Sequence, residues 1–174
     1  MIYKANVGCG KRNFGEDWLH FDGGNFDHVI DQDISLSLLP DEYFHLIYSS
    51  HLIAYFDRQQ IVELFVSWYN KLKPRGILRL ATPNFRVMSR LYLQTNLPIE
   101  KILGPMYGRM EMNGELIYHK TVWDFRSLAQ ILNEVGFHGV DYYDHKETEH
   151  AQFDDHSAAY IDGNLISLNI QAIK

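Results

Sequence analysis

Residues Ala5-Asn6-Val7-Gly8-Cys9-Gly10 run from a short apolar strand into a turn that contains two glycines. A second predicted strand, Trp18-Leu19-His20-Phe21, ends on Asp22. Glycines after a first strand let the backbone approach a ligand closely, and an acid at the tip of the second strand can accept hydrogen bonds from a ribose diol. The stretch therefore predicts a binding site for a cofactor that contains a nucleoside.

The composition of the chain is that of one globular domain spanning residues 1–174. Hydrophobic residues make up 46% of the 174 residues, which is enough for one core. The net charge is −6 and there is no long basic stretch. Because nucleic-acid binding needs a patch that neutralises phosphates, this charge argues against nucleic acid as a substrate.

Three features bear on the compartment. No apolar run approaches the roughly 20 residues that span a membrane, so no membrane span is predicted. The first residues enter a strand directly, which leaves no room for a signal peptide. The single cysteine, Cys9, is compatible with a reducing environment. We therefore expect a cytoplasmic protein.

Strands and helices alternate along most of the chain. Apolar runs predict strands at residues 3–7, 18–21, 28–33, 45–49, 77–81, 139–143 and 165–172. Apolar residues at helical spacing predict helices over residues 57–73 and 124–135, whereas residues 11–21 leave room only for a shortened helix or one or two turns. This order predicts an α/β fold with a mostly parallel sheet, helices on both faces and a terminal antiparallel hairpin.

Residues 86–118 do not fit this alternation. They are rich in methionine and tyrosine and contain glycines and two prolines. A long segment after the C-terminal end of a sheet strand often covers a site, so we expect a substrate lid at 86–118. Packing into the core, or against a second copy in a homodimer, is an equally good interpretation of these side chains.

On these residues the chain resembles a class I S-adenosylmethionine-dependent methyltransferase of the short, single-domain type. The resemblance rests on Asn6–Gly10, Trp18–Asp22, Asp33-Ile34, Leu39–His51, Lys73–Leu80 and Leu128–Phe137. It implies a Rossmann-like, seven-stranded sheet in the order 3-2-1-4-5-7-6, with strand seven antiparallel. It also implies S-adenosylmethionine as the cofactor.

The resemblance assigns roles to particular residues. Gly8 and Gly10 would let the backbone pass close to the methionine part of the cofactor, and Asp22 would bind the ribose hydroxyls. Asp33 with Ile34 would lie at the adenine, and Ser49 or Ser50 would face the sulfonium. The set of implied cofactor-binding residues is completed by Asn6, Val7, Cys9 and Gly23.

Structural alternatives stand beside these roles. The two glycines could serve only a tight turn, and Asp22 could be a turn or cap carboxylate. The neighbouring Asp31 could take the place of Asp33. Cys9 is better explained as a small packed residue than as a nucleophile, since the sequence shows no basic partner for it.

The sequence departs from the family pattern at two places. Ala54-Tyr55 stand where many relatives carry Glu-His, which removes a carboxylate and an imidazole from beside the site. Arg12 stands where the longer glycine motif has its third glycine.

His51 and His119 are the candidate catalytic bases. His51 follows the fourth predicted strand, and its structural alternative is to brace that loop. His119 precedes the last helix, and its structural alternative is a position on the surface. The histidines at 145, 150 and 156, with Asp154 and Asp155, match no tight metal-ligand spacing, so no metal is predicted.

The function expected from the resemblance is in-line methyl transfer to a small-molecule or saccharide-type acceptor. A non-catalytic module that binds S-adenosylmethionine or S-adenosylhomocysteine is the alternative, because Glu-His is absent. A nicotinamide-dependent oxidoreductase is a third interpretation, but Asp22 comes early for that fingerprint.

Overall fold

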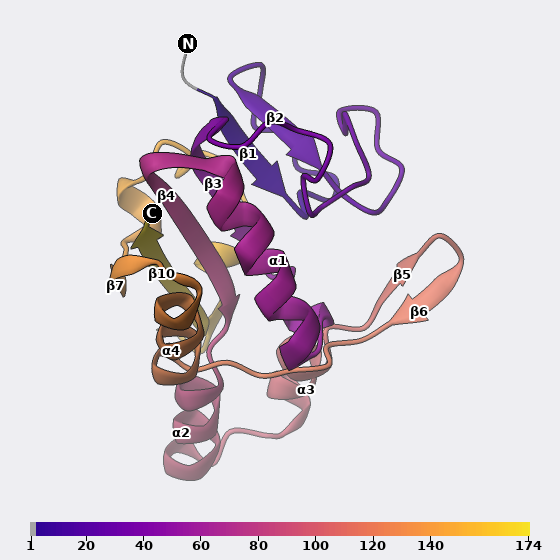
Figure 1. Cartoon of the computed structure of the whole chain (residues 1–174). Helices are drawn as coiled ribbons and strands as arrows, with labels where there is room; N and C mark the ends of the chain where they lie inside the picture. Colours follow the sequence, from indigo (N-terminus) through magenta and orange to yellow (C-terminus); the bar gives the residue numbers. More distant parts are fainter. Residues whose placement is uncertain (1–2) are drawn as a thin grey trace.

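The central sheet has six strands in the order β2-β1-β3-β4-β10-β7 (Figure 1). The computed structural model describes residues 3–174. The strands are β1 (Lys4–Val7), β2 (Trp18–Phe21), β3 (Phe44–Ser50), β4 (Leu72–Pro83), β7 (His138–Tyr142) and β10 (Ser167–Ile173). The first four are parallel, and β10 is antiparallel to β4 and to β7. This is the implied order without its third strand, and it confirms the α/β fold.

The strand predicted at residues 28–33 does not form. The segment makes only an isolated bridge between Phe21 and Asp31. The Asp31 side chain accepts a hydrogen bond from the Asp33 N–H, and Asp33 accepts from Ser35 and Ser37. Such side-chain bonds to nearby amides turn the backbone away from an extended strand.

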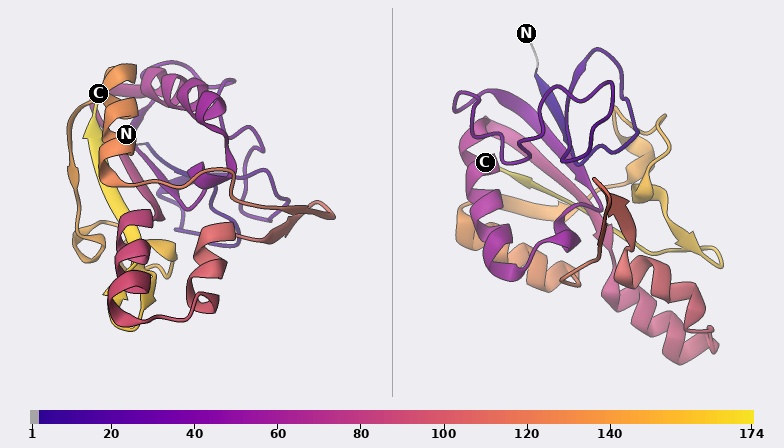
Figure 2. Two further views of the ribbon diagram at one scale, coloured as in Figure 1. Left: turned by 90° about the horizontal axis from the view of Figure 1, so that it is seen from below. Right: turned by 90° about the vertical axis from the view of Figure 1, so that its right-hand side faces the viewer.

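Two helices, α1 (Arg58–Lys71) and α4 (Phe125–Val135), cover the same face of the sheet (Figure 2). Asp57 and Asp124 cap their first turns. Both predicted helices are confirmed, although α1 ends two residues before Lys73. Within residues 3–174 no helix has the length and apolar character needed to cross a membrane.

The sequence predicts helices on both faces, but the opposite face carries short turns in place of α-helices. Residues 8–17, between β1 and β2, form turns without a helix. The 3-10 helices η2 (His145–Glu147) and η3 (His156–Ala158) follow β7. Phe14, Trp18 and Tyr48 are buried here in a second core cluster against Phe153. The residues that flank the first glycine turn are therefore held by aromatic packing.

The segment 86–118 contains regular structure of its own. After β4 come α2 (Phe85–Thr95), α3 (Glu100–Tyr107) and an antiparallel hairpin of β5 (Met110–Met112) and β6 (Glu115–Ile117). The two helices share a small apolar cluster with the region of β8 (Tyr160–Ile161) and β9 (Asn164–Leu165). Figure 1 shows the hairpin extending away from α3 and past the end of α1.

The start of β4 also differs from the expectation. The sequence predicts that Pro74-Arg75-Gly76 separates a helix from a strand beginning at residue 77. In the structure Leu72 already pairs with Phe44, and the next pair joins Leu46 to Ile77. The extra residues bulge out at Arg75, whose φ is 64°. The bulge explains why a turn-forming sequence lies inside one long strand.

Candidate functional site

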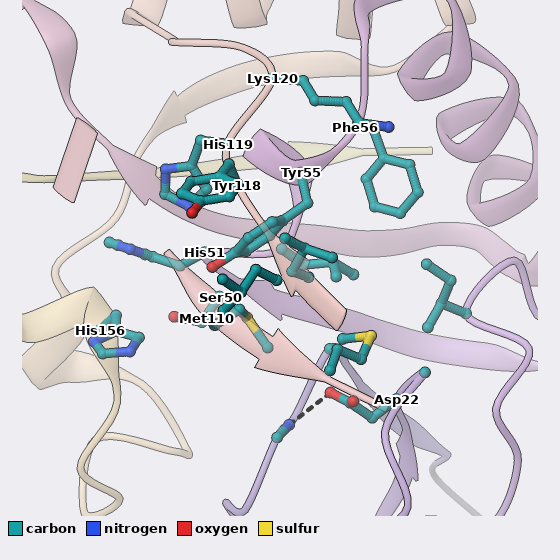
Figure 3. Close-up of a pocket in the computed structure, with 18 of the residues that line it drawn as sticks. Asp22, Ser50, His51, Tyr55, Phe56, Met110, Tyr118, His119, Lys120 and His156 are labelled. Carbon is teal, nitrogen blue, oxygen red and sulfur yellow. Dashed lines mark hydrogen bonds between the residues drawn. The ribbon is translucent and has the colours of Figure 1, made fainter. Parts of the chain in front are cut away.

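A cavity of about 570 Å³ opens at the C-terminal ends of β1, β2 and β3 (Figure 3). This is where open α/β sheets place their ligands. One side, which we call the strand wall, consists of Gly8, Gly10, Asp22, Gly23, Ser50 and His51. The facing side, the outer wall, consists of Met110, Met112, Leu116, Ile117, Tyr118, His119 and Lys120. The cavity is completed by Arg12, Ile34, Leu52, Tyr55, Phe56 and His156.

The glycine turn is held to β2 by backbone hydrogen bonds. The Gly8 N–H donates to the Phe21 carbonyl at 2.7 Å. Gly8 and Gly10 have φ values of 75° and 56°, a region that favours glycine. A Cβ at Gly8 would lie 2.8 Å from the Leu52 side chain, so no larger residue fits without moving Leu52.

Asp22 lines the cavity and organises the backbone around it. One carboxylate oxygen accepts from the Gly10 N–H and the other from the Gly24 N–H, each at 2.7 Å. The residue is only 5% exposed. A carboxylate has about four acceptor positions, so both oxygens retain capacity for a further donor.

Asp33 has a different environment. Its two oxygens accept hydrogen bonds from the amide and hydroxyl groups of both Ser35 and Ser37. Burial alone would raise its pKa, but these hydrogen bonds outweigh that effect and lower it. The cavity is lined by Ile34 and not by Asp33. The adenine role of Asp33 stays a prediction, and the structure favours a turn-forming role for this carboxylate.

Four other predicted cofactor residues lie behind the cavity surface. Asn6, Val7, Cys9 and Ser49 are buried and do not line it. Burial, followed by the nearby Asp22 charge, raises the pKa of Cys9 to about 12, so its thiol is protonated at neutral pH. Ser50 does line the cavity, and its hydroxyl oxygen has no hydrogen-bond partner within residues 3–174.

His51 lines the strand wall. Its Nε2 lies 3.3 Å from the Ser167 hydroxyl, and its ring centroid is 5.1 Å from that of His156. Burial, together with the charges of His156, His119 and Arg12, holds its pKa well below the usual value. The imidazole is therefore neutral at physiological pH.

His119 lies on the outer wall. Its Nδ1 is 3.0 Å from the Pro105 carbonyl, so Nδ1 carries the proton and Nε2 retains its lone pair. Burial lowers the pKa of His119, although carbonyl contacts from Met106 and Pro105 oppose the shift. A Cβ at Gly108 would lie 2.1 Å from His119 Nε2. Gly108 thus makes room for the ring.

Tyr55 and Ala54 show what the departure from Glu-His does here. Ala54 is buried, and its carbonyl accepts from the Lys120 and Thr121 amides. Tyr55 lines the cavity and donates its hydroxyl to the Gly108 carbonyl at 2.6 Å. Its ring packs edge-on against His119 at 4.5 Å. The pair therefore connects the strand wall to the outer wall.

The late histidines are separated from one another. His156 lines the cavity, whereas His150 is buried among the rings of Phe14, Trp18 and Tyr48. Residues 3–174 contain no group of three or more His, Cys, Asp or Glu side chains that could hold a metal ion.

Several lining residues lay outside the sequence prediction of site residues. The methionine and tyrosine content of residues 86–118 marked the outer wall as a region but did not single out Met110, Met112 or Tyr118. Arg12 and Tyr55 were noted only as departures. Nothing in the sequence indicates that His156 lies at this cavity, because its contact residue Arg12 is 144 positions away in the chain.

Neither a protein-family model nor a curated protein matches the chain. Solved structures do. An S-adenosylmethionine-dependent methyltransferase from Archaeoglobus fulgidus has a TM-score of 0.61 at 19% identity, covering 99% of this chain and 86% of that one. A possible exported protein from Bordetella parapertussis has a TM-score of 0.58 at 15% identity; the match covers 99% of this chain and 61% of that one.

A third similar structure is the 1,6-didemethyltoxoflavin-N1-methyltransferase from Burkholderia thailandensis, with bound 1,6-didemethyltoxoflavin and S-adenosylhomocysteine. Its TM-score is 0.57 at 11% identity, covering 99% of this chain and 70% of that one. These likenesses show that the chain has the Rossmann-like fold found in S-adenosylmethionine-dependent methyltransferases.

Proposed function

We propose that this chain is an S-adenosylmethionine-dependent methyltransferase that transfers a methyl group in line to a small-molecule or saccharide-type acceptor. The observation that carries the proposal is the Asp22 carboxylate, which lines a cavity beside a glycine turn at the C-terminal ends of parallel strands. The fold likeness supports it. So does the Burkholderia thailandensis structure, which contains a small-molecule acceptor and the demethylated cofactor.

The strand wall fits the proposed cofactor. Gly8 and Gly10 provide a close backbone approach, and Asp22 has acceptor capacity for ribose hydroxyls. Ser50 lines the cavity beside them. S-adenosylmethionine, when bound there, supplies an activated methyl group on a sulfonium. The protein then has to bind the acceptor, orient its nucleophile and exclude water.

The outer wall fits an acceptor with apolar surface. Met110, Met112 and Ile117 face the strand wall from the hairpin, in line with the lid that the sequence predicts at 86–118. His119 Nε2 is the group best prepared to accept a proton from an acceptor hydroxyl, because Nδ1 is engaged with the Pro105 carbonyl. His51 is the second candidate, on the opposite wall.

A non-catalytic binding module is the second candidate function. It is favoured by the small number of acidic side chains in the cavity. Among the described residues that line the cavity, Asp22 is the only acid, and its carboxylate already accepts hydrogen bonds from two backbone amides. In that case the protein would bind S-adenosylhomocysteine and S-adenosylmethionine but methylate nothing. One methylated product identified by mass spectrometry across a panel of small molecules and saccharides would exclude this alternative.

Calorimetry with S-adenosylhomocysteine tests the proposal. We expect binding by the unchanged protein and about 100-fold weaker binding by Asp22→Ala, because a charged hydrogen-bond acceptor is lost. Asp17→Ala, which removes an exposed acid outside the cavity, is the matched control and should bind normally. Asp22→Asn retains the side-chain shape, and thermal melts of each variant separate lost affinity from lost folding. Absence of binding at millimolar ligand would refute the proposal.

A further inference from the structure

The glycine turn has little capacity left for an anion. In many nucleotide-binding folds, free amides at a helix N-terminus hold the negative group of the ligand. Here residues 8–17 form no helix. The N–H groups of Gly8 and Cys9 donate to the Phe21 carbonyl, Gly10 donates to Asp22, and Arg12 donates to Cys9. These four amides are engaged within the protein, which leaves side chains as the main donors for a negatively charged ligand group.

Arg12 and His156 provide such side chains. The Arg12 Nε–H donates to the backbone carbonyl of Asp154 at 2.8 Å, which fixes the guanidinium in place. Its Nη2 lies 3.4 Å from His156 Nε2. Both residues line the cavity. The contacts join the first turn of the chain to the segment after β7, so the pair exists only in the folded protein.

The charge of Arg12 is not neutralised by an ion pair. Across residues 3–174, no carboxylate lies within ion-pairing distance of its guanidinium. Asp22, the acid among the described residues that line the cavity, accepts hydrogen bonds from the Gly10 and Gly24 amides. Figure 3 shows Asp22 and His156 at opposite sides of the cavity, with Ser50 and His51 between them. The two ends therefore differ in charge.

We infer that Arg12 and His156 form a carboxylate-binding site at the end of the cavity away from Asp22. The inference rests on the proposed function, because a cofactor that has its ribose at Asp22 and extends past Ser50 would bring its amino-acid carboxylate toward this end. A carboxylate on the acceptor has the same chemistry. A guanidinium binds either one by parallel N–H donors, with the His156 ring as an additional partner.

The test compares two nucleoside ligands, one with and one without the amino-acid portion. S-adenosylhomocysteine contains the amino-acid carboxylate, whereas methylthioadenosine lacks the amino-acid portion. Calorimetry would measure both ligands with the unchanged protein, Arg12→Ala, Arg12→Lys and the control Lys11→Ala, an exposed neighbour of equal charge that does not line the cavity. We expect Arg12→Ala to weaken S-adenosylhomocysteine by about 10- to 100-fold and methylthioadenosine by less than about twofold. Arg12→Lys should recover part of the loss.

A second arm detects an acceptor carboxylate. Glutarate would be titrated into protein saturated with S-adenosylhomocysteine. If Arg12→Ala leaves both nucleosides unchanged but abolishes glutarate binding, the site serves the acceptor. Equal weakening of both nucleosides, or no change with any ligand, would overturn the inference while leaving the proposed function intact. If the unchanged protein binds neither nucleoside, the proposed function fails and the inference fails with it.

Discussion

The two walls of the cavity are built in different ways. The strand wall comes from the ends of three neighbouring parallel strands, and hydrogen bonds such as Gly8 to Phe21 and Gly10 to Asp22 fix its backbone. The outer wall comes from a hairpin and the segment after it, and its methionines, leucine and tyrosine contribute apolar side chains. Under the proposed function, the strand wall would bind the cofactor and the outer wall would serve the acceptor. Variants of His119, Gly8 and Asn113 test this division.

The largest expected effect is on His119. His119→Asn places an amide nitrogen near the position of Nδ1, which keeps a donor toward the Pro105 carbonyl, but it removes the Nε2 base. With the acceptor from the product screen, kcat should fall about 100- to 10,000-fold, the usual contribution of a general base. The affinity for S-adenosylhomocysteine should be unchanged. His138→Asn, on an exposed strand, is the control.

The pH profile gives the same residue a second readout. Because the pKa of His119 is lowered from 6.5, the base is neutral at physiological pH and the rate should be flat there. The rate should fall only as the pH drops through a value below 6.5. An acid limb centred above 6.5, or one retained in His119→Asn, would remove His119 from the proton transfer.

The second largest effect is expected on the strand wall. Gly8→Ala adds a Cβ 2.8 Å from Leu52 and should displace that side chain into the cavity. We expect S-adenosylhomocysteine to bind on the order of 10- to 100-fold more weakly. Gly15→Ala is matched in backbone strain, since Gly15 also has a positive φ, but its Cβ would meet nothing within 4 Å. Equal affinity losses in both variants would assign the effect to backbone strain.

The packing of the segment that carries His156 can be tested through the effect of its buried neighbour, His150, on the pH dependence of stability. Burial lowers the pKa of His150 to about 4, and neither ring nitrogen has a hydrogen-bond partner within residues 3–174. The unfolded chain therefore binds this proton near pH 6.5 and the folded chain near pH 4. The contribution of His150 to the free energy of unfolding is therefore fully present above pH 6.5. It is lost as the pH falls from 6.5 to 4, by up to about 3 kcal/mol.

His150→Leu should remove this part of the pH dependence, as measured by urea unfolding between pH 4 and pH 7. Burial also lowers the pKa of His20 to about 4. The contribution of His20 to the pH dependence of the free energy of unfolding should therefore remain in this variant. An unchanged slope in His150→Leu would show that the ring is not buried in the neutral form.

The smallest effect concerns the contact between the walls. Asn113, at the hairpin turn, donates its side-chain amide to the Gly23 carbonyl at 3.2 Å. Because the bond is exposed, Asn113→Ala should speed S-adenosylhomocysteine dissociation by only about two- to threefold in stopped-flow measurements. Asn133→Ala, on an exposed position of α4, should have no effect. A change of about 100-fold would mean that the hairpin holds the cofactor more firmly than one hydrogen bond can.

The strand wall was predictable because its signals are local. A glycine turn after one strand and an acid at the end of the next are adjacent in sequence and fixed by backbone geometry. The same logic failed at residues 28–33, where Val29 and Ile30 suggested a strand. The side chains of Asp31 and Asp33 bind the following amides instead, and Ile30 is 58% exposed. Polar side-chain competition outweighed apolar content.

The outer wall and the Arg12–His156 pair were not predictable in this way. Their geometry depends on contacts between distant parts of the chain, such as Tyr55 with Gly108 and Arg12 with Asp154. Sequence spacing carries no record of such contacts. The composition of residues 86–118 identified a segment of interest, but only the fold shows which of its side chains reach the cavity.

The absence of the third strand leaves β2 at the margin of the sheet, where unpaired backbone groups invite a strand from another molecule. Residues 30 and 31 occupy that margin: the Ile30 N–H donates to the His20 carbonyl, and the Asp31 carbonyl accepts from the Asp22 N–H. The irregular backbone beyond them, bent by Asp31 and Asp33, offers no straight row of donors and acceptors. The segment that failed to become a strand therefore covers the β2 edge, and covering an edge is one way in which natural sheets avoid edge-to-edge pairing.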